Sequence, residues 1–132
     1  MSLDPQYAGT PNVSANTQTT LNNVYDGTGT VGTCFTAGAN GSFVSFIKLK
    51  PLGTNATTVA RFWINNGSTN ATASNNYLIS EITLPATTAG TTALIELPIP
   101  LNVAINGGYK INWALGITAT AGWQATVFGG DL

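Results

Sequence analysis

Short segments of alternating apolar and polar residues, separated by turns, constrain this chain more than any other feature. The clearest lies at residues 109–117, where Tyr109, Ile111 and Trp113 alternate with polar or small residues. Such period-two alternation is typical of a β-strand with one buried face. Turn signals rich in Gly, Asn and Pro separate the segments, and no segment has a helical period. The sequence therefore predicts an all-β fold.

We expect about seven or eight strands, a number typical of two-sheet β domains. They are predicted at residues 31–36, 42–52, 57–65, 77–84, 93–97, 101–105, 109–117 and 123–128. Pro98 and Pro100 indicate an edge strand or a crossing between sheets, because proline cannot donate to a central ladder. The expected architecture is an antiparallel β-sandwich, jelly-roll-like. An immunoglobulin-like Greek-key sandwich is the alternative, since the pattern leaves the strand order open.

Two of the predicted strands indicate which side chains are buried. One face of segment 42–52 ends in two lysines and is expected to meet solvent there; the other face consists of Phe43, Ser45, Ile47 and Leu49. In segment 57–65, Phe62 and Trp63 fall on opposite faces, so we expect this strand to be covered on both sides. Of the tryptophans, Trp63 is the one expected to be exposed, because Arg61 shares its face.

Residues 1–30 differ in composition from the rest of the chain. Residues 12–20 are almost wholly Asn, Thr, Ser, Ala and Gln, and a stretch of this kind buries little surface by itself. We expect an extended N-terminal arm at 1–30 that orders against a partner, followed by a β-sandwich domain at 31–132. A floppy terminus is the alternative. Within the arm, residues 26–29 (Asp-Gly-Thr-Gly) resemble part of a calcium loop but lack its further acids, which favours a simple turn.

The surface of this protein must be almost free of charge. Charged residues make up 7% of the chain, against about 25% in typical domains, and 21 Thr and 14 Asn fill the polar positions. Four cations are too few to track nucleic-acid phosphates, and no apolar run approaches the ~20 residues of a membrane span. We therefore expect neither nucleic acid nor membrane as a partner. A surface poor in charge loses little solvation on burial, which favours lasting association with protein; an ordinary Thr-rich soluble domain is the alternative.

The residues that catalysis and metal binding need are missing. The chain has no histidine, the commonest general base and metal ligand. The single cysteine, Cys34, is interpreted as a small buried apolar residue. Glu81 and Glu96 both lie in predicted strands and could face each other as a glycosidase pair, but pairing with Arg61 or Lys110 is favoured. We expect no enzyme activity, no cofactor and no metal.

Binding to a partner is the function that remains. The residues predicted to contact one are the large apolar residues of the arm and the pair on segment 57–65: Tyr7, Leu21, Val24, Tyr25, Arg61 and Trp63. Exposed aromatic rings can also form a platform for sugars. The candidates for that role are Trp63, Tyr77 and Phe128, whereas Trp113 and Trp123 are expected in the core.

Five segments carry a resemblance to a known family. They are Val59-Ala60-Arg61-Phe62-Trp63-Ile64-Asn65-Asn66-Gly67, Glu81-Ile82-Thr83-Leu84-Pro85-Ala86-Thr87, Ile95-Glu96-Leu97-Pro98-Ile99-Pro100-Leu101, Gly107-Gly108-Tyr109-Lys110-Ile111 and Ala121-Gly122-Trp123-Gln124-Ala125-Thr126-Val127. The chain from residue 31 to 132 resembles the small β-sandwich virion proteins of tailed bacteriophages, which occur as head decoration (cement) proteins or fibre-associated modules.

The resemblance implies a structural virion protein made in the host cytoplasm and placed on the capsid exterior. A decoration protein of this kind binds the outer surface of the major capsid protein, typically as a homotrimer, and stabilises the phage head. The alternative that the resemblance implies is a carbohydrate- or receptor-binding module of a tail fibre, with a glycan as partner. The family supplies no site residues that can be transferred to this chain.

Overall fold

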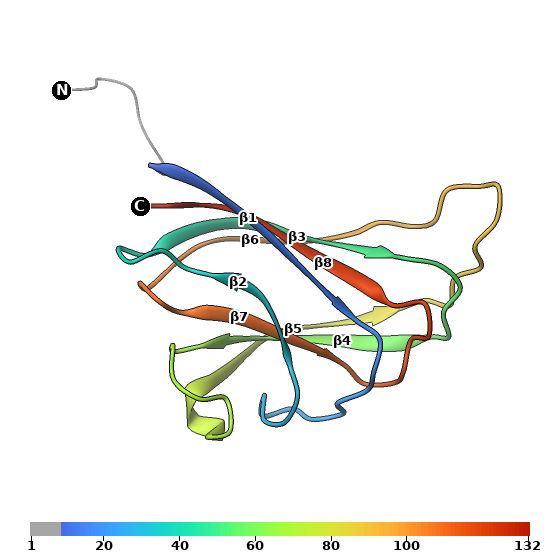
Figure 1. The fold of residues 1–132 in the computed structure, drawn as a ribbon, viewed down its shortest axis with the longest axis horizontal. Coiled ribbons are helices and arrows are strands. Elements are labelled where there is room, and N and C mark those ends of the chain that lie inside the picture. Colours follow the sequence, from blue (N-terminus) through green and yellow to red (C-terminus); the bar gives the residue numbers. More distant parts are fainter. Residues whose placement is uncertain (1–8) are drawn as a thin grey trace.

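The computed structural model of this protein describes residues 9–132, so Tyr7 and the other first residues of the expected arm lie outside the described part. The described residues form eight strands and one 3-10 turn, η1 at Ala73–Asn75 (Figure 1). The strands are β1 Thr10–Gln18, β2 Gly32–Thr36, β3 Ser42–Pro51, β4 Thr58–Asn65, β5 Asn76–Leu84, β6 Leu97–Ile105, β7 Lys110–Leu115 and β8 Trp123–Asp131. The prediction of an all-β fold with about seven or eight strands is confirmed.

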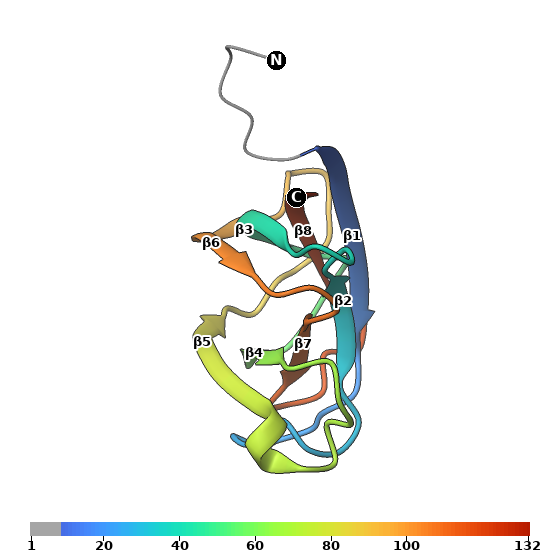
Figure 2. The ribbon, with the colours of Figure 1, turned by 90° about the vertical axis from the view of Figure 1, so that its left-hand side faces the viewer.

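The strands form two antiparallel four-stranded sheets packed face to face (Figure 2). The upper sheet in Figure 1 has the order β1-β8-β3-β6, and the lower sheet has the order β2-β7-β4-β5. Strand β1 pairs with β8, β2 with β7, β3 with β6 and β4 with β5. This nested pairing is a long hairpin of four strand pairs rolled into a sandwich, which is the jelly roll. The predicted jelly-roll-like sandwich is confirmed, and the order differs from that of the immunoglobulin fold.

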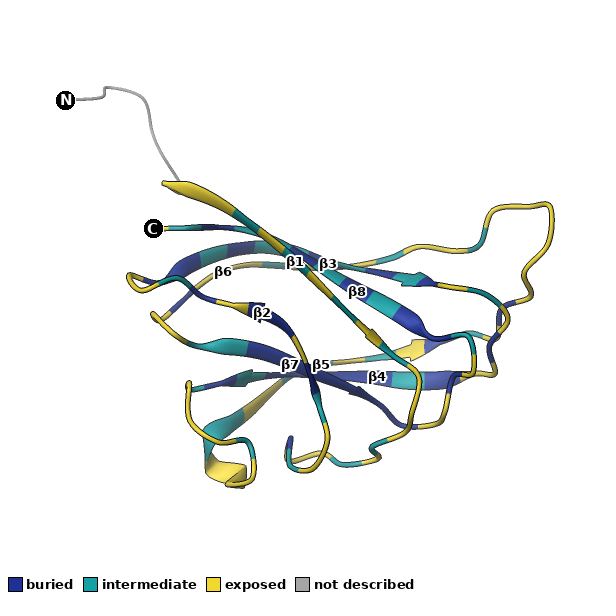
Figure 3. Cartoon of the chain, in the orientation of Figure 1, coloured by how far each residue is buried: buried dark blue, intermediate teal, exposed yellow. Residues whose placement is uncertain are grey.

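The core lies between the two inner faces. Strands β4 and β7 are the most deeply buried (Figure 3), and the rings of Phe62 and Trp113 stack with centroids 5.5 Å apart. Trp113 and Trp123 are both fully buried, as predicted. Each large apolar side chain buried in this way contributes about 1.5–3 kcal/mol to stability.

A bulge in β3 changes the side chains that face the core. The register of β3 against β8 shifts between Val44 and Phe46, which inserts one extra residue and turns the strand. Val44 therefore joins Ile47 and Leu49 in the core, each 0% exposed. The prediction that Phe43 shares that face is wrong, because strict alternation fails at the bulge.

Residues 10–18 are a strand of the sandwich rather than an extended arm. Strand β1 pairs with β8 along its whole length, from Thr10 opposite Asp131 to Gln18 opposite Trp123. Its inward side chains are polar and form hydrogen bonds with the facing strands of the other sheet. Ser14 Oγ, for example, donates to the carbonyl oxygen of Cys34 in β2 at 2.6 Å. The expected boundary at residue 30 is thus not seen, because hydrogen bonds replace the apolar burial that the sequence lacks.

The segment before β6 also differs from expectation. The sequence predicts a strand at residues 93–97, but β6 begins at Leu97 and runs through Pro98 and Pro100 to Ile105. The prolines sit on an edge strand, as their missing N–H groups predict. Residues 101–105 belong to this same strand.

Candidate functional site

The connection between β1 and β2 crosses the outer face of the lower sheet (Figures 1 and 2). We call residues 19–31 the strap. Its backbone N–H at Asn22 donates to the carbonyl oxygen of Leu115 at 2.8 Å, at the end of β7. Further along, its carbonyl oxygens at Tyr25 and Asp26 accept from side chains of β4 and β5. The strap therefore spans the sheet from β7 across β4 to β5.

Arg61 anchors the middle of the strap. Its guanidinium donates from Nε to Glu81 Oε2 at 2.9 Å and from Nη1 to Asn23 Oδ1 at 2.7 Å. Its Cζ lies 3.9 Å from the centroid of the Tyr25 ring. Charge-assisted hydrogen bonds and a cation–π contact together hold this arginine at 5% exposure.

The turn at residues 26–29 fastens the far end of the strap. Asp26 Oδ1 accepts from the N–H and the hydroxyl of Thr28, at 3.1 and 2.7 Å, and these bonds hold the Asp26 pKa below its usual 3.8. Gly27 has φ +76°, and a Cβ there would lie 2.8 Å from the Asn76 Cβ, so only glycine fits. The carboxylate of the calcium-like sequence is thus used by its own turn, as the turn interpretation requires.

The residues predicted to contact a partner fall into two groups: those on the strap, and those on β4 that the strap covers. Leu21 and Tyr25 lie on the strap and are 57% and 61% exposed, and Val24 beside them is partly exposed. Trp63 is 0% exposed beneath it, and its Nε1–H donates to the Tyr25 carbonyl oxygen at 2.8 Å. The predicted exposure of Trp63 is therefore wrong. The prediction that segment 57–65 is covered on both faces agrees with the burial of β4.

The outer face of the upper sheet carries an apolar row that no strap crosses in the described part of the chain (Figure 2). Val13 of β1, Phe128 of β8, Phe46 of β3 and Pro100 of β6 lie opposite one another in register across all four strands. Val13 is 56% exposed, Pro100 is exposed and the two phenylalanines are partly exposed. The Phe46 and Phe128 rings stack at 4.6 Å between centroids, with 15° between their planes. We call these four residues the outer row.

The sequence singled out only one member of the outer row, Phe128. The signal for Phe46 was its position on the lysine-bearing face of segment 42–52, which the structure places outward. Val13 could not be found because residues 10–18 were not recognised as a strand.

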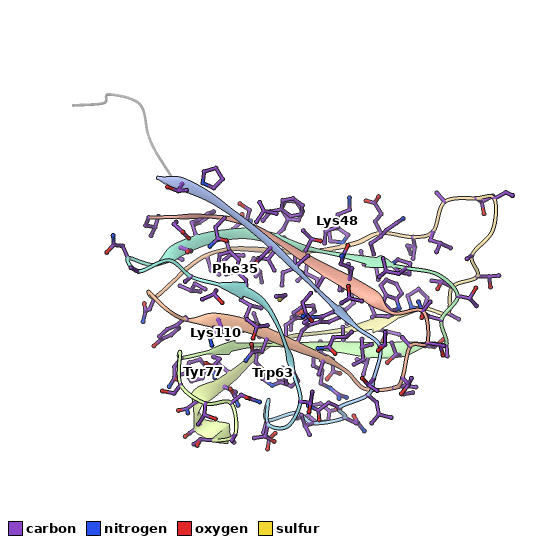
Figure 4. The ribbon with its side chains drawn as sticks, in the orientation of Figure 1. Phe35, Lys48, Trp63, Tyr77 and Lys110 are labelled. Atoms are coloured by element: carbon purple, nitrogen blue, oxygen red, sulfur yellow. The ribbon has the colours of Figure 1, made fainter. Side chains whose placement is uncertain are left out.

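The lysines beside the outer row are engaged within the chain. Lys48, which Figure 4 shows on the upper sheet, forms an ion pair with Glu96 at 3.1 Å between Nζ and Oε2. Lys50 Nζ donates to the carbonyl oxygen of Leu94 at 2.6 Å. Because Lys48 and Glu96 are about half exposed, the pair is worth only ~0–1 kcal/mol, but it neutralises the charge at this surface.

The hypothesis of a glycosidase pair is wrong. Glu81 lies on the outer face of the lower sheet with Arg61, whereas Glu96 pairs with Lys48 on the upper sheet. Two carboxylates on opposite sheets cannot flank one glycosidic bond. The favoured pairing with Arg61 or Lys110 is confirmed for Glu81, which binds Arg61, but it is wrong for Glu96, whose partner is Lys48.

The Cys34 thiol and the carboxylates of the described residues do not form a reactive or metal-binding site. Cys34 is 1% exposed, and burial raises the pKa of its thiol to about 12, so it stays protonated at neutral pH. Among residues 9–132 there is no cluster of three or more side chains able to hold a metal ion. Nor does that part of the chain contain a helix long and apolar enough to cross a membrane.

Comparisons with known proteins give little to add to this geometry. No protein-family model matches the chain, and no curated protein matches it. A solved structure with some similarity is a chain of the T13 IBDV viral particle, at 13% identity and a TM-score of 0.28. The match covers 96% of this chain but about a third (34%) of the viral one. The chain thus has a weak structural neighbour in a viral particle, and a TM-score this low carries no inference about fold or function.

Proposed function

We propose that this protein is a structural virion protein without enzyme activity, which attaches to a capsid through the outer face of its upper sheet. The observation that carries the proposal is the outer row: four apolar residues in register across a sheet face that residues 9–132 leave at least partly exposed. Large exposed apolar patches on soluble proteins commonly mark interaction sites. The lower sheet, by contrast, is already covered by the strap.

The neutral surroundings of the outer row suit a permanent contact. Burial of apolar area contributes roughly 25 cal/mol per Å², and little of this is offset where few charges must lose water. Contacts that are weak singly become strong when many copies attach to one repetitive shell. A virion surface supplies such repetition.

The finer identity follows the family resemblance. We propose a decoration (cement) protein of a tailed-phage head, made in the host cytoplasm, located on the capsid exterior and bound as a homotrimer to the major capsid protein. The jelly roll is compatible with this role, since viral capsid proteins use it, but lectin domains use it as well. Fold analogy alone therefore does not choose between them.

Co-sedimentation with capsids of the cognate phage that lack this protein tests the proposal. Val13→Lys and Phe46→Lys place charge in the outer row, and we expect each to weaken binding at least tenfold. Ile117→Lys is the matched control, because Ile117 is 55% exposed and lies in the turn between β7 and β8. Absence of binding by the wild-type chain, or equal weakening by the control, would refute attachment through this face.

A carbohydrate-binding module is the second candidate, and Tyr25 is the residue that favours it. One face of its ring lies on the Arg61 guanidinium, and the side chain is 61% exposed, so the ring is held in place with area open to solvent. Of the three residues predicted to form a sugar platform, Trp63 is buried, Phe128 stacks on Phe46, and Tyr77 is 48% exposed. A glycan array comparing wild type with Tyr25→Ala decides: binding that this change abolishes supports the module, and silence on the array ends it.

A further inference from the structure

The two lateral sides of the sandwich, where the edge strands of the two sheets face each other, differ in chemistry. On the side where β1 meets β2, side chains of β1 bind backbone and ring atoms across the gap: Asn12 Nδ2 donates to the Thr36 carbonyl oxygen at 3.0 Å, and Asn16 Oδ1 accepts from Trp113 Nε1 at 2.9 Å. This side is therefore sealed by polar contacts within one chain.

The opposite side lies between β5 and β6 (Figure 2), and its side chains are apolar and incompletely covered. We call its residues the seam; they are Tyr77, Ile79 and Ile82 of β5 and Leu97, Leu101 and Val103 of β6. Four of them pack against the core while remaining partly exposed. Tyr77, at the edge of the lower sheet in Figure 4, is 48% exposed, and Val103 is 38% exposed.

We propose that the seam is the contact surface for a second copy of this chain. This deepens the self-association in the proposed function and rests on that part of it alone, not on the capsid. We take the partner to be a second copy for two reasons: the exposed apolar area of the seam is close to that of a protein interface, and the carboxylates beside it are already paired within the chain.

The exposed apolar area of the seam comes close to that of a standard interface. Such interfaces bury about 800 Å² per partner, of which roughly 56–65% is apolar. Taking an aromatic side chain as roughly 150–250 Å² and the aliphatic ones as smaller, the seam residues and Ile95, which lies two positions before β6 and is 45% exposed, supply on the order of 400 Å². The seam thus comes close to the apolar content that a stable contact between two copies needs, in a trimer as in a dimer.

The charges beside the seam allow two copies to meet. When a surface contacts its own copy, like charges approach each other, and an unpaired carboxylate would repel. Glu81 of β5 is held by Arg61 at 2.9 Å, and Glu96 before β6 is held by Lys48 at 3.1 Å. Each carboxylate next to the seam therefore carries its own intramolecular counterion.

The backbone at the seam favours packing of side chains over a continuous intermolecular sheet. Pro98 and Pro100 lie two residues apart on β6 and remove two N–H donors from one edge. On β5, the register against β4 shifts at Ile79, and a bulge of this kind twists an edge away from strand addition. Association should consequently leave the β-content unchanged.

Sedimentation of the full chain over a concentration series tests the inference. We expect the wild type to form a multiple of its 13.6 kDa mass. Tyr77→Lys with Val103→Lys, which changes the two most exposed seam residues, should weaken association at least tenfold, with the circular dichroism of the folded chain retained. Leu52→Lys with Ile117→Lys is the control, since these residues are 50% and 55% exposed but lie outside the seam. The single variant Tyr77→Lys repeats the test should the double variant fold poorly.

A strictly monomeric wild type up to about 100 μM would overturn the inference, as would association that the control weakens and the seam variants do not. The capsid test is separate. If outer-row variants still oligomerise but no longer bind capsids, the seam remains supported as the contact between copies. If seam variants become monomeric, this result does not bear on capsid attachment through the outer row.

Discussion

The hydrogen bond between Asn16 and Trp113 decides whether β1 is a strand of the folded monomer. The Trp113 ring is 0% exposed, and its Nε1 donates to Asn16 Oδ1 at 2.9 Å. In Asn16→Ala the indole N–H loses its acceptor, and an unsatisfied buried donor costs about 1–3 kcal/mol. In a Trp113→Phe background there is no N–H to satisfy, so the same change should cost a few tenths of a kcal/mol. The double-mutant cycle should therefore give a coupling energy of about 1–2 kcal/mol.

Urea unfolding of the four proteins, followed by circular dichroism, measures this coupling. Thr17→Ala is the control on the same strand, because Thr17 is exposed and should show no coupling to Trp113→Phe. Distant, independent sites add within about 0.3–0.5 kcal/mol. Additivity of Asn16→Ala and Trp113→Phe within that range would refute the docking of β1 and restore the view of residues 1–30 as an arm.

Two substitutions and one labelling experiment test other parts of the structure. Asn55→Ala should cost about 2–4 kcal/mol in urea unfolding, because Asn55 Oδ1 accepts from the partly buried backbone N–H of residue 121 and the buried one of residue 122, at 3.0 and 2.9 Å; a loss under 0.5 kcal/mol would contradict its role. Hydrogen bonds, first that from Ser42, lower the pKa of Asp131 below 3.8, so its carboxylate stabilises the fold above that pH and the contribution is lost as pH falls through the lower folded value. The stability deficit of Asp131→Asn should thus be constant from pH 7 to 5 and shrink below pH 3.8; a deficit that grows on acidification would be inconsistent with this. Cys34 should resist thiol reagents at pH 8 until urea unfolds the chain, and rapid labelling of the native protein would show that the thiol is not buried as described.

The sequence predicted the sandwich because most strands alternate in the ordinary sense, with apolar side chains inward. Strand β1 escaped notice because it inverts that rule: Asn12, Ser14, Asn16 and Gln18 point inward and Val13 outward. Its polar side chains bind backbone groups of β2 and β7 instead of filling the core. A period-two run of short amides and hydroxyls is a possible strand signal, but it acquires meaning only once the partner strand is known.

The prediction of the candidate site was likewise limited, because it depends on which segment lies against the outer face of β4. Tyr25, Arg61 and Trp63 are predicted from the sequence to contact a partner, and the structure brings them into contact with one another. The sequence could not show that the partner of Arg61 and Trp63 is the chain's own strap. An aromatic residue on the outer face of a strand gives the same sequence pattern whether its own chain or a partner covers it. Only the path of residues 19–31 across the sheet distinguishes the two cases.

Asparagine explains how this fold manages with so few charges. Asn22 Nδ2 donates to the Thr28 and Thr30 carbonyl oxygens, and Asn70 Nδ2 donates to those of Gly27 and Gly29, so amides hold both sides of the strap. An amide offers donors and an acceptor without a charge to desolvate, and it can therefore satisfy loop backbone next to apolar surface at little cost. The outer row and the seam can then remain neutral. Because they lie on different sides of the sandwich, a copy can contact a neighbouring copy through one while the other stays free for a shell.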